Sequence, residues 1–285
     1  MNLETSAVRS RLAEHTAVLT SLAEFSSREN VQLYLVGGTV RDLLMGRITG
    51  DLDFAIYGDA ISFARKFADH INARSIPLDE EQDTARVVCN KGKLVMDFTR
   101  IHGSDIREDL TARDFTINAM AIDFRQVMGK NMAEVIDPYG GVDDLNNKLI
   151  RLASAQSIKE DPVRMLRAYR FAATLDFMIE LVTVSIIQDS VSLLNVVSAE
   201  RVRDELFKIL EVRGSAYYLK AMDSAGLLER VFPEMIPMKG MEQNEYHHLD
   251  AWCHSMLTLE FFEQDPIPGS LNDRLSEVEE YLEYE

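Results

Sequence analysis

The stretch LYLVGGTVRDLLMGRITGDLDFAI, residues 33–56, holds the features from which the fold of this chain can be inferred. Its first four residues are apolar and suit a strand, two glycines follow, and a helical pattern begins at about Val40. A strand that enters a helix through glycines leaves bare backbone N–H groups and a helix N-terminus, which together suit an anion such as a triphosphate. We therefore predict a phosphate site at Gly37 and Gly38.

Two carboxylates open the second predicted strand, DLDFAI at residues 51–56. Residues i and i+2 of a strand point to the same face, so Asp51 and Asp53 are expected to project together. Neighbouring carboxylates repel at neutral pH unless a cation lies between them, and Mg²⁺ suits such a site because it prefers oxygen ligands. Two metal ions can activate a hydroxyl and stabilise a pyrophosphate leaving group. Taken singly, a Gly-Gly turn and a solvated Asp-x-Asp strand edge remain open as purely structural interpretations.

The chain changes character near residue 150. Before that point short β-rich runs alternate with amphipathic segments, and after Arg151 the pattern is helical throughout. This predicts an α+β protein, with a small mixed-sheet head followed by an all-α neck and body. A second boundary falls near residues 215–235, where Gly226 and Pro233 interrupt the helical period. The strands predicted after residue 56 cover 86–89, 93–99 and 118–124, and the predicted helices cover 1–25, 60–72, 162–175, 181–194, 199–210, 216–224 and 251–262.

Composition and charge limit the class of protein. Of the 285 residues, 46% are hydrophobic and 27% are charged, which is ordinary for a globular chain. No apolar run approaches the roughly 20 residues of a membrane span, and the N-terminus lacks the pattern of a secretion signal. Cys89 and Cys253 lie far apart, which favours reduced thiols over metal ligands, so we expect a cytoplasmic protein without membrane contact. The net charge of −17 opposes binding of nucleic acid by the whole surface, so any RNA site must be a confined basic face.

A second motif is EDLTARDFTINAMAID, residues 108–123. Arg113 opens a segment whose later apolar residues are spaced for packing, so its guanidinium can reach a phosphate while Asn118 lies at the edge of the packed element. A surface ion pair between Arg113 and Asp114 is the structural alternative.

A third motif is KEDPVRMLRAYRFAATL, residues 159–175. Asp161, Arg164 and Arg167 are three residues apart and share one face of the predicted helix. The structural interpretation is that Asp161 caps this helix, with Pro162 at its first position, and pairs with Arg164 on the surface.

The ordered combination of these motifs resembles the class II tRNA CCA-adding enzymes and bacterial poly(A) polymerases, within the polymerase β nucleotidyltransferase superfamily. The resemblance covers roughly residues 30–260. One departure is Ala112, which replaces the first arginine of the family's RRDFTINAMA motif, so only Arg113 can carry the phosphate role. Two further segments, at 136–153 and 197–210, resemble later family motifs. For these we predict structural roles, as a turn and helix start at Gly140, Gly141, Asp143 and Asp144, and as helix-to-helix pairs through Glu200, Arg201 and Glu205.

The resemblance implies a template-independent enzyme in which an RNA 3′-hydroxyl attacks the α-phosphorus of CTP or ATP and pyrophosphate leaves. Asp51 and Asp53 are then the catalytic residues and hold Mg²⁺. Asp97 is a candidate third metal ligand, because superfamily members commonly place a carboxylate on a neighbouring strand, and a plain surface residue is the alternative. The predicted nucleotide-binding residues are Gly37, Gly38, Arg41, Arg113, Asn118, Asp161, Arg164 and Arg167.

Base selection is implied for Asp161 and Arg164, which match the aspartate and first arginine of the family's EDxxRxxRxxRF motif. The hydrogen-bond chemistry agrees, because a carboxylate accepts from the exocyclic amine of C or A while a guanidinium donates to the adjacent ring acceptor. G and U present a carbonyl at that position, which would leave Asp161 facing an acceptor. CTP and ATP are therefore the expected substrates.

The segment MKGMEQNEYHHLDAWCHSMLTLEFF, residues 238–262, carries a group of possible metal ligands, namely His247, His248, Asp250 and His254. It resembles the start of an HD-type domain, but the later His-Asp dipeptide of a full HD site is missing from the sequence. A structural role is the favoured interpretation. We accordingly predict a catalytic head over 1–150, a helical neck over 151–230, and a truncated or vestigial HD-like segment over 231–285.

The product remains open at this point. The stretch between Arg100 and Arg113 is shorter than the flexible element that CCA-adding relatives usually carry there, which favours a partial enzyme that adds only CC or only A. The expected acceptor is the tRNA 3′ end, with no obligate protein partner evident. The alternatives are a poly(A) polymerase, an HD phosphohydrolase that uses His247 or His248, and a non-catalytic RNA-binding relative.

Overall fold

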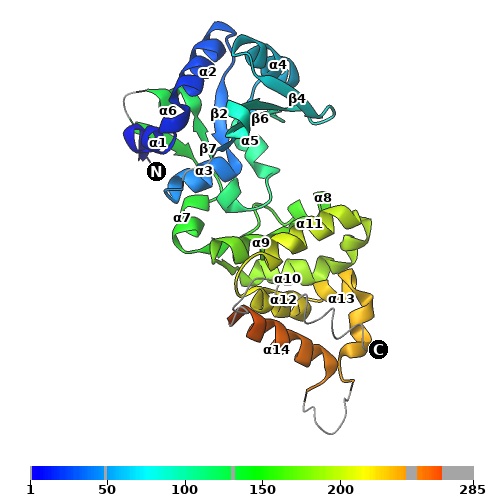
Figure 1. The fold of residues 1–285 in the computed structure, drawn as a ribbon. Coiled ribbons are helices and arrows are strands. Elements are labelled where there is room, and N and C mark those ends of the chain that lie inside the picture. Colours follow the sequence, from blue (N-terminus) through cyan, green and yellow to red (C-terminus); the bar gives the residue numbers. More distant parts are fainter. Residues whose placement is uncertain (1, 48–49, 130–131, 242–248, 265–285) are drawn as a thin grey trace, which may run out of the picture. The chain divides into compact units, whose positions relative to one another are not determined.

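The chain folds into two compact units, residues 1–187 and residues 188–285. The computed structural model describes residues 2–47, 50–129, 132–241 and 249–264 (Figure 1). The first unit extends past the predicted head boundary near residue 150 because a two-stranded parallel ladder, β9 (Leu149–Ile150) with β10 (Met178–Ile179), ties the following segment to it. The division into head, neck and HD-like segment stays a prediction.

The first unit is built on one mixed sheet of eight strands in the order β1-β8-β7-β2-β3-β6-β5-β4. Its neighbours pair antiparallel except for β3 and β6, which run parallel. The expected arrangement of a mixed-sheet head followed by helices is confirmed. The strands are β1 (Asn2–Glu4), β2 (Leu33–Val36), β3 (Asp51–Ile56), β4 (Arg74–Asp79), β5 (Thr84–Cys89), β6 (Leu94–Arg100), β7 (Ala121–Asp123) and β8 (Met132–Ile136).

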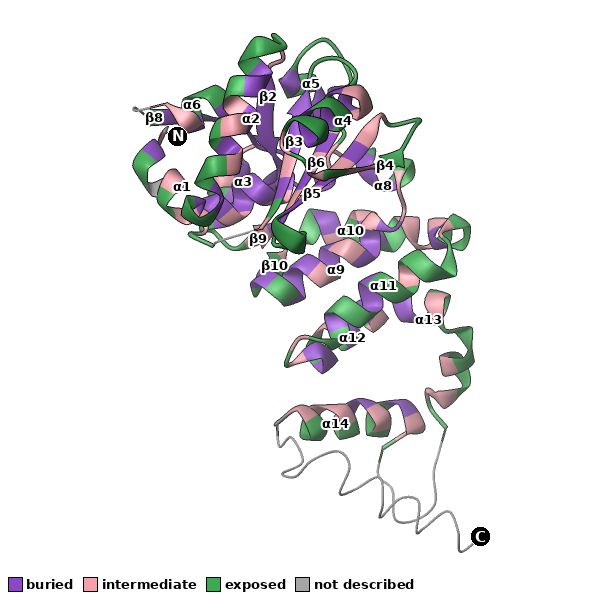
Figure 2. Ribbon diagram, turned by 45° about the horizontal axis from the view of Figure 1, so that its top comes forward, coloured by how far each residue is buried: buried purple, intermediate pink, exposed green. Residues whose placement is uncertain are grey.

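The main core lies between one face of this sheet and four helices, and Val40 and Leu43 of a fifth helix, α3 (Gly37–Leu44), are buried in it as well. Apolar side chains at alternate strand positions, such as Leu52 and Phe54, pack there against helical residues such as Phe67. In α4 the buried residues recur at helical spacing, and Asp59 caps the helix by accepting a hydrogen bond from the Ser62 backbone N–H at 2.7 Å. Buried residues line the strands in Figure 2, whereas the outer turns of the helices are exposed. The four helices are α1 (Thr5–Arg11), α2 (Thr16–Arg28), α4 (Ala60–His70) and α6 (Phe124–Met128).

The opposite sheet face carries a smaller apolar cluster and the polar residues of the site. The cluster includes Tyr34, Val36 and Ala55, the alternate positions to those of the main core. The remaining helices of this unit come from the segments around and after the sheet. They are α3 (Gly37–Leu44), α5 (Ile106–Thr111), α7 (Gly141–Asn146), α8 (Ser157–Glu160), α9 (Arg164–Leu175) and α10 (Leu181–Ser190), with 3₁₀ turns at Ala13–His15, Asn90–Gly92 and Thr116–Asn118.

Several predicted boundaries were wrong. The N-terminal helix expected over 1–25 is divided into β1, α1, a 3₁₀ turn and α2, because residues 2–4 pair with β8 and α1 ends at Arg11. The helix expected from Pro162 begins at Arg164, since Asp161 has an extended backbone. The helix expected over 181–194 ends at Ser190 and continues as a 3₁₀ helix, Val191–Val196.

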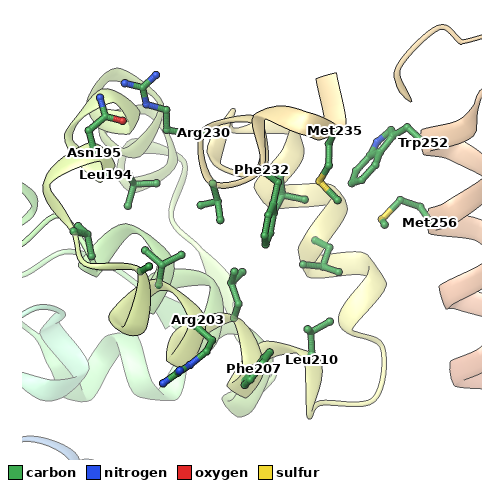
Figure 3. Close-up of a pocket in the computed structure, with 17 residues that line it drawn as sticks. Leu194, Asn195, Arg203, Phe207, Leu210, Arg230, Phe232, Met235, Trp252 and Met256 are labelled. Atoms are coloured by element: carbon green, nitrogen blue, oxygen red, sulfur yellow. The ribbon is translucent and has the colours of Figure 1, made fainter. Parts of the chain in front are cut away.

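Among the described residues, the second unit is helical. Its elements are the end of α10, the 3₁₀ helix Val191–Val196, α11 (Ala199–Leu210), α12 (Ser215–Ser224), α13 (Leu227–Val231), a 3₁₀ helix (Pro233–Met238) and α14 (Ala251–Gln264). An apolar cavity of about 570 Å³ lies inside this unit, with Phe232, Met235 and Trp252 among its lining residues (Figure 3). Within the part of the chain that the structure describes, no helix has the length and apolar character needed to cross a bilayer.

Gly141 gives a first stability prediction. A Cβ built at Gly141 would overlap the carbonyl oxygen of Thr116, so Gly141→Ala must displace backbone. We expect the free energy of unfolding, measured in urea, to fall by at least about 2 kcal/mol. Gly129→Ala is the control, because Gly129 has negative φ and its Cβ would lie 3.1 Å from the nearest atom. A change at Gly141 no larger than at Gly129 would contradict the close approach.

Candidate active site

The two predicted catalytic carboxylates lie at the start of β3, on the sheet face away from the main core. The parallel pairing places Asp53 opposite Asp97 of β6 and Asp51 opposite Val95. Residues 52, 54 and 56 are buried in the main core, so 51 and 53 must point to the other face. The prediction that Asp51 and Asp53 share a face is confirmed.

Asp53 lies in a setting that opposes its negative charge. Burial raises the pKa of Asp53, and the charges of Asp97 and Asp51 raise it further, whereas Arg113 and Arg41 act in the lowering direction. A cation between the carboxylates would relieve this repulsion, and carboxylate oxygens are the ligands that Mg²⁺ prefers. Asp51 and Asp53 therefore fit a magnesium ion through a pair of carboxylates. No group of three or more potential ligands in a metal-binding arrangement occurs among the described residues.

Asp97 has a strong protein partner. Both of its carboxylate oxygens accept hydrogen bonds from Arg86 of β5, the Nε and the Nη2 each at 2.8 Å. This bidentate pair is the planar geometry that arginine and carboxylate favour. The structure thus brings Asp97 beside Asp53, as expected, but occupied by Arg86, and its role as a metal ligand stays a prediction.

The Gly-Gly turn brings the start of α3 beside these carboxylates. Gly37 has φ +63°, and a Cβ there would meet Arg113 Nη1 at 3.6 Å and Asp53 Oδ2 at 3.7 Å, so glycine leaves space between the two side chains. Thr39, one turn into α3, accepts a hydrogen bond from the Asp53 backbone N–H at 2.7 Å. These contacts hold β3, which carries Asp51 and Asp53, against α3, whose N-terminus faces the site.

A buried polar chain connects α3 to α9. Arg41 Nη1 donates to Asn118 Oδ1 at 2.8 Å, and Asn118 Nδ2 donates to Asp114 Oδ1 at 2.9 Å. The other Asp114 oxygen accepts from Arg167 Nε at 2.9 Å and Nη2 at 2.6 Å. Three of the predicted nucleotide-binding residues are therefore joined through Asp114, which the sequence analysis had assigned no nucleotide-binding role.

Asp114 is ionised in spite of its burial. Burial acts to raise the pKa of Asp114, but Arg167 and the hydrogen bonds from Asn118 and the Phe115 backbone outweigh burial and hold that pKa below its usual value. The surface pair considered between Arg113 and Asp114 is not the observed arrangement, because Arg113 Nη2 instead bonds Asp109 Oδ2 at 3.1 Å. Asp109 and Arg113 are one helical turn apart, which explains the pairing.

Arg164 is held in place at the start of α9. Its Nη1 donates to the hydroxyl and carbonyl oxygens of Ser157 at 3.0 and 3.2 Å, and its Nη2 donates to the Ala112 carbonyl at 2.8 Å. Its ion pair with Glu160 spans 3.6 Å. Ala112, which replaces an arginine of the family motif, thus binds Arg164 through its backbone carbonyl and not through a side chain.

These residues surround one cavity of about 420 Å³ that lies wholly within the first unit. Five arginines and three aspartates contribute to its lining, and three of these arginines pair with acids outside it, namely Asp42, Asp109 and Glu160. Arginines are thus concentrated at this cavity, and a confined basic face for RNA stays a prediction. The lining residues are Gly37, Gly38, Arg41, Asp53, Ala112, Arg113, Asp114, Asn118, Asp161, Arg164, Arg167, Arg170 and Phe171.

The sequence analysis missed Asp114, Arg170 and Phe171 as site residues. Arg170 continues the three-residue spacing of Arg164 and Arg167, so the helical period could have included it. All eight predicted nucleotide-binding residues line the cavity, whereas Asp51 and Asp97 are outside that lining.

The other candidate residues have structural contacts. Asp144 accepts hydrogen bonds from Thr116 and from Arg151, and Gly140 takes a left-handed backbone before α7, as expected of a turn and helix start. Asp250 accepts from the backbone N–H groups of Cys253 and Gly240 at 2.7 and 2.9 Å, which makes it a capping residue of α14. His254 lies in α14, while His247 and His248 fall outside the described residues.

The larger cavity of the second unit has a different chemistry. Among the described residues that line it, Asn195, Arg203 and Arg230 are the polar side chains apart from the Trp252 ring nitrogen, and none of them carries a carboxylate or an imidazole. Figure 3 shows the Phe232 and Met235 side chains directed into this space and the two guanidinium groups directed outward. The site of the first unit, whose described lining includes carboxylates, is therefore the better candidate active site.

Comparison with known proteins agrees with this geometry. Residues 33–151 match the family described as the poly A polymerase head domain, and residues 176–239 match the one described as a probable RNA and SrmB-binding site of polymerase A. The chain belongs to the class II CCA-adding enzyme and poly(A) polymerase family. The first match contains the Gly-Gly turn, both β3 carboxylates and the Arg113 motif.

Relatives within this family differ in the products that their names state. The CC-adding tRNA nucleotidyltransferase of Geobacter sulfurreducens is 40% identical over 70% of this chain and 45% of its own length. The A-adding tRNA nucleotidyltransferase of Deinococcus radiodurans is 34% identical over 79% of this chain and 50% of its own. The solved structure of a CCA-adding enzyme with ATP has a TM-score of 0.72 and 30% identity, and the match covers 86% of this chain and 59% of that one. The chain spans about half the length of the curated relatives that it matches.

Proposed function

We propose that the protein is a tRNA nucleotidyltransferase that adds C or A from CTP or ATP to the 3′ end of tRNA and releases pyrophosphate. The observation that carries the proposal is the single cavity in which Asp53, the arginine cluster and the Asp161–Arg164 pair of residues meet. A nucleotide needs charged groups that bind its triphosphate and, beside them, hydrogen-bonding groups that bind its base, and this cavity offers both. The names of the relatives, which are CC-adding and A-adding enzymes, support the choice of acceptor and substrates.

The positions of the side chains support the following chemistry. The tRNA 3′-oxygen forms a bond to the α-phosphorus while the bond from that phosphorus to the bridging oxygen breaks and pyrophosphate leaves. Gly37, Gly38, Arg41 and Arg113 bind the triphosphate, Arg167 and Asn118 support the nucleotide, and Asp51 and Asp53 hold Mg²⁺. The metal, when bound, would supply charge stabilisation to the attacking and leaving oxygens.

Asp161 and Arg164 select the base in this proposal. Arg164 is fixed by Ser157 and by the Ala112 carbonyl, so its guanidinium is oriented before any nucleotide arrives. A fixed donor next to a carboxylate acceptor matches the edges of C and A and mismatches those of G and U.

The deciding assay uses tRNA that ends before CCA, after the first C, or after CC. Each acceptor is incubated with Mg²⁺ and one labelled nucleotide, CTP or ATP, and product lengths are read on a gel. We expect either addition of up to two C residues or addition of a single A to tRNA ending in CC. Addition of C residues from CTP to the two shorter acceptors together with addition of A from ATP to tRNA ending in CC would indicate a full CCA-adding enzyme, and long A tails on unrelated RNA would indicate a poly(A) polymerase. Release of inorganic phosphate would indicate a phosphohydrolase, and binding of tRNA without incorporation a non-catalytic relative.

Asp161→Ala gives a sharper test of base selection. We expect kcat/KM for the cognate nucleotide to fall about 100-fold and its preference over GTP and UTP to fall at least about tenfold, because the acceptor for the exocyclic amine is gone. The control is Asp176→Asn, an exposed carboxylate at the other end of α9 whose left-handed backbone asparagine tolerates. Unchanged discrimination in Asp161→Ala would remove Asp161 from base selection.

A further inference from the structure

Three guanidinium groups converge on the ring of Phe171. The Cζ atoms of Arg170, Arg41 and Arg167 lie 4.0, 5.2 and 5.3 Å from the ring centroid. Arg41 comes from α3 and the other two from α9, so one ring contacts arginines of two separate helices. Phe171 is 6% exposed, yet it belongs to the lining of the candidate active site.

The ring offers these arginines an attraction that no carboxylate can supply. A carboxylate such as Asp114 binds Arg167 but also cancels its charge. The face of an aromatic ring is the negative end of a quadrupole, and it attracts a guanidinium without cancelling its formal charge. Arg41 also donates from Nε and Nη2 to the Asp42 carboxylate, at 2.9 and 3.1 Å, so the ring acts beside carboxylates in ordering these guanidinium groups.

A second aromatic ring packs against Phe171. Phe115, fully buried, packs its ring against that of Phe171 in an edge-to-face contact, with centroids 5.6 Å apart and an angle of 79° between the planes. Asp114, the neighbour of Phe115 in the chain, binds the Arg167 guanidinium. The Phe171 ring contacts the same guanidinium, so ring and carboxylate order it together.

We propose that Phe171 is a positioning residue for the triphosphate, whose ring holds the arginine cluster of Arg41, Arg167 and Arg170 in the geometry that binds phosphate oxygens. This deepens the proposed function and rests on it only in taking this cavity as the triphosphate site. If the Phe171 ring only filled space, its removal would change the stability of the protein alone. If the ring positions the arginines, its removal also weakens the binding of a polyanion, beyond any change in stability.

The test is calorimetric titration of the full chain with inorganic tripolyphosphate at two salt concentrations, alongside a thermal melt. We expect the dissociation constant of Phe171→Leu to rise about tenfold, with a weaker salt dependence than in the wild-type protein. Phe171→Tyr keeps the ring face and should bind within about threefold of wild type. Adenosine or cytidine, which carries no phosphate, should bind Phe171→Leu as it binds the wild type.

Phe115→Leu is the matched control for lost packing. It removes a buried ring from the same pair, and none of the cation–aromatic contacts of the described residues involves Phe115. Its tripolyphosphate affinity should stay within about twofold of wild type even where its melting temperature falls. Equal affinity for Phe171→Leu and wild type, or an equal loss in Phe115→Leu and Phe171→Leu, overturns the proposal. A wild-type protein that binds no tripolyphosphate contradicts instead the proposed function of the cavity.

Discussion

Asp53→Ala is expected to reduce incorporation of labelled CTP or ATP into tRNA by at least about a thousandfold, with the fold intact. The change removes one of the two carboxylates proposed to hold Mg²⁺, and with it the stabilisation of the charge that develops on the reacting oxygens. Asp69→Ala, which removes an exposed carboxylate on α4, should leave incorporation unchanged. Activity of Asp53→Ala within tenfold of wild type would remove the central catalytic assignment.

Asp53, although proposed to be required for activity, is expected to lower the stability of the metal-free protein. Because the pKa of Asp53 is raised in the folded state, the folded protein binds the proton more tightly than the unfolded chain does. The resulting stability is present at acid pH and is lost as the pH rises through the folded pKa. Asp53→Asn should therefore raise the melting temperature at pH 7 in metal-free buffer, and the gain should vanish below about pH 4. A melting temperature lowered at pH 7 would contradict the unfavourable setting of Asp53.

Asp114→Ala has the largest expected effect on stability. Its carboxylate is 7% exposed and accepts hydrogen bonds from Arg167 and Asn118. Removing one partner of a buried pair leaves the other charge uncompensated, and we expect the free energy of unfolding to fall by about 3–5 kcal/mol at pH 7. The pKa of Asp114 is lowered in the folded state, so its contribution is present above the unfolded pKa and lost as the pH falls through the folded one. The penalty should accordingly shrink in acid.

Two further variants test how much the pairing of Asp114 with Arg167 contributes to stability. Asp143→Ala removes an exposed carboxylate in the first turn of α7 and should change the free energy of unfolding by less than about 1 kcal/mol. The double variant Asp114→Ala with Arg167→Met should lose less stability than the two single variants together, because no guanidinium is left without its carboxylate. Strictly additive losses would show that Asp114 and Arg167 act independently.

The local part of the site was predictable from the sequence, because it depends on short periods. The two-residue period of a strand placed Asp51 and Asp53 on one face, and the three-residue spacing placed Arg164 and Arg167 on one helix. The partners of these residues could not be predicted in that way. Asp114 meets Arg167 across 53 positions of the chain, and no local pattern encodes a contact of that range.

The elements and residues that were not predicted likewise lack a local signal in the sequence. Strand β4 is largely exposed, so it lacks the alternation of buried and exposed residues that marks a half-buried strand. The pairing of Leu149–Ile150 with Met178–Ile179 was not predicted either, because a ladder of only two residues on each side leaves no periodic signal. Phe171 was overlooked because an aromatic residue in a helix normally fills a core, and only the guanidinium groups around it reveal a second role.

The parallel pairing of β3 with β6 has a consequence for the order of folding events. Parallel neighbours cannot be joined by a tight hairpin, and here the chain passes through α4, β4 and β5 before β6 returns beside β3. Asp53 and Asp97 therefore become neighbours only after this whole excursion has closed a long loop, a step whose entropy cost slows non-local contacts. The mutual repulsion of their carboxylates therefore arises only once β3 and β6 have paired. In refolding kinetics, protection of the β3–β6 amides should follow that of the β5–β6 hairpin.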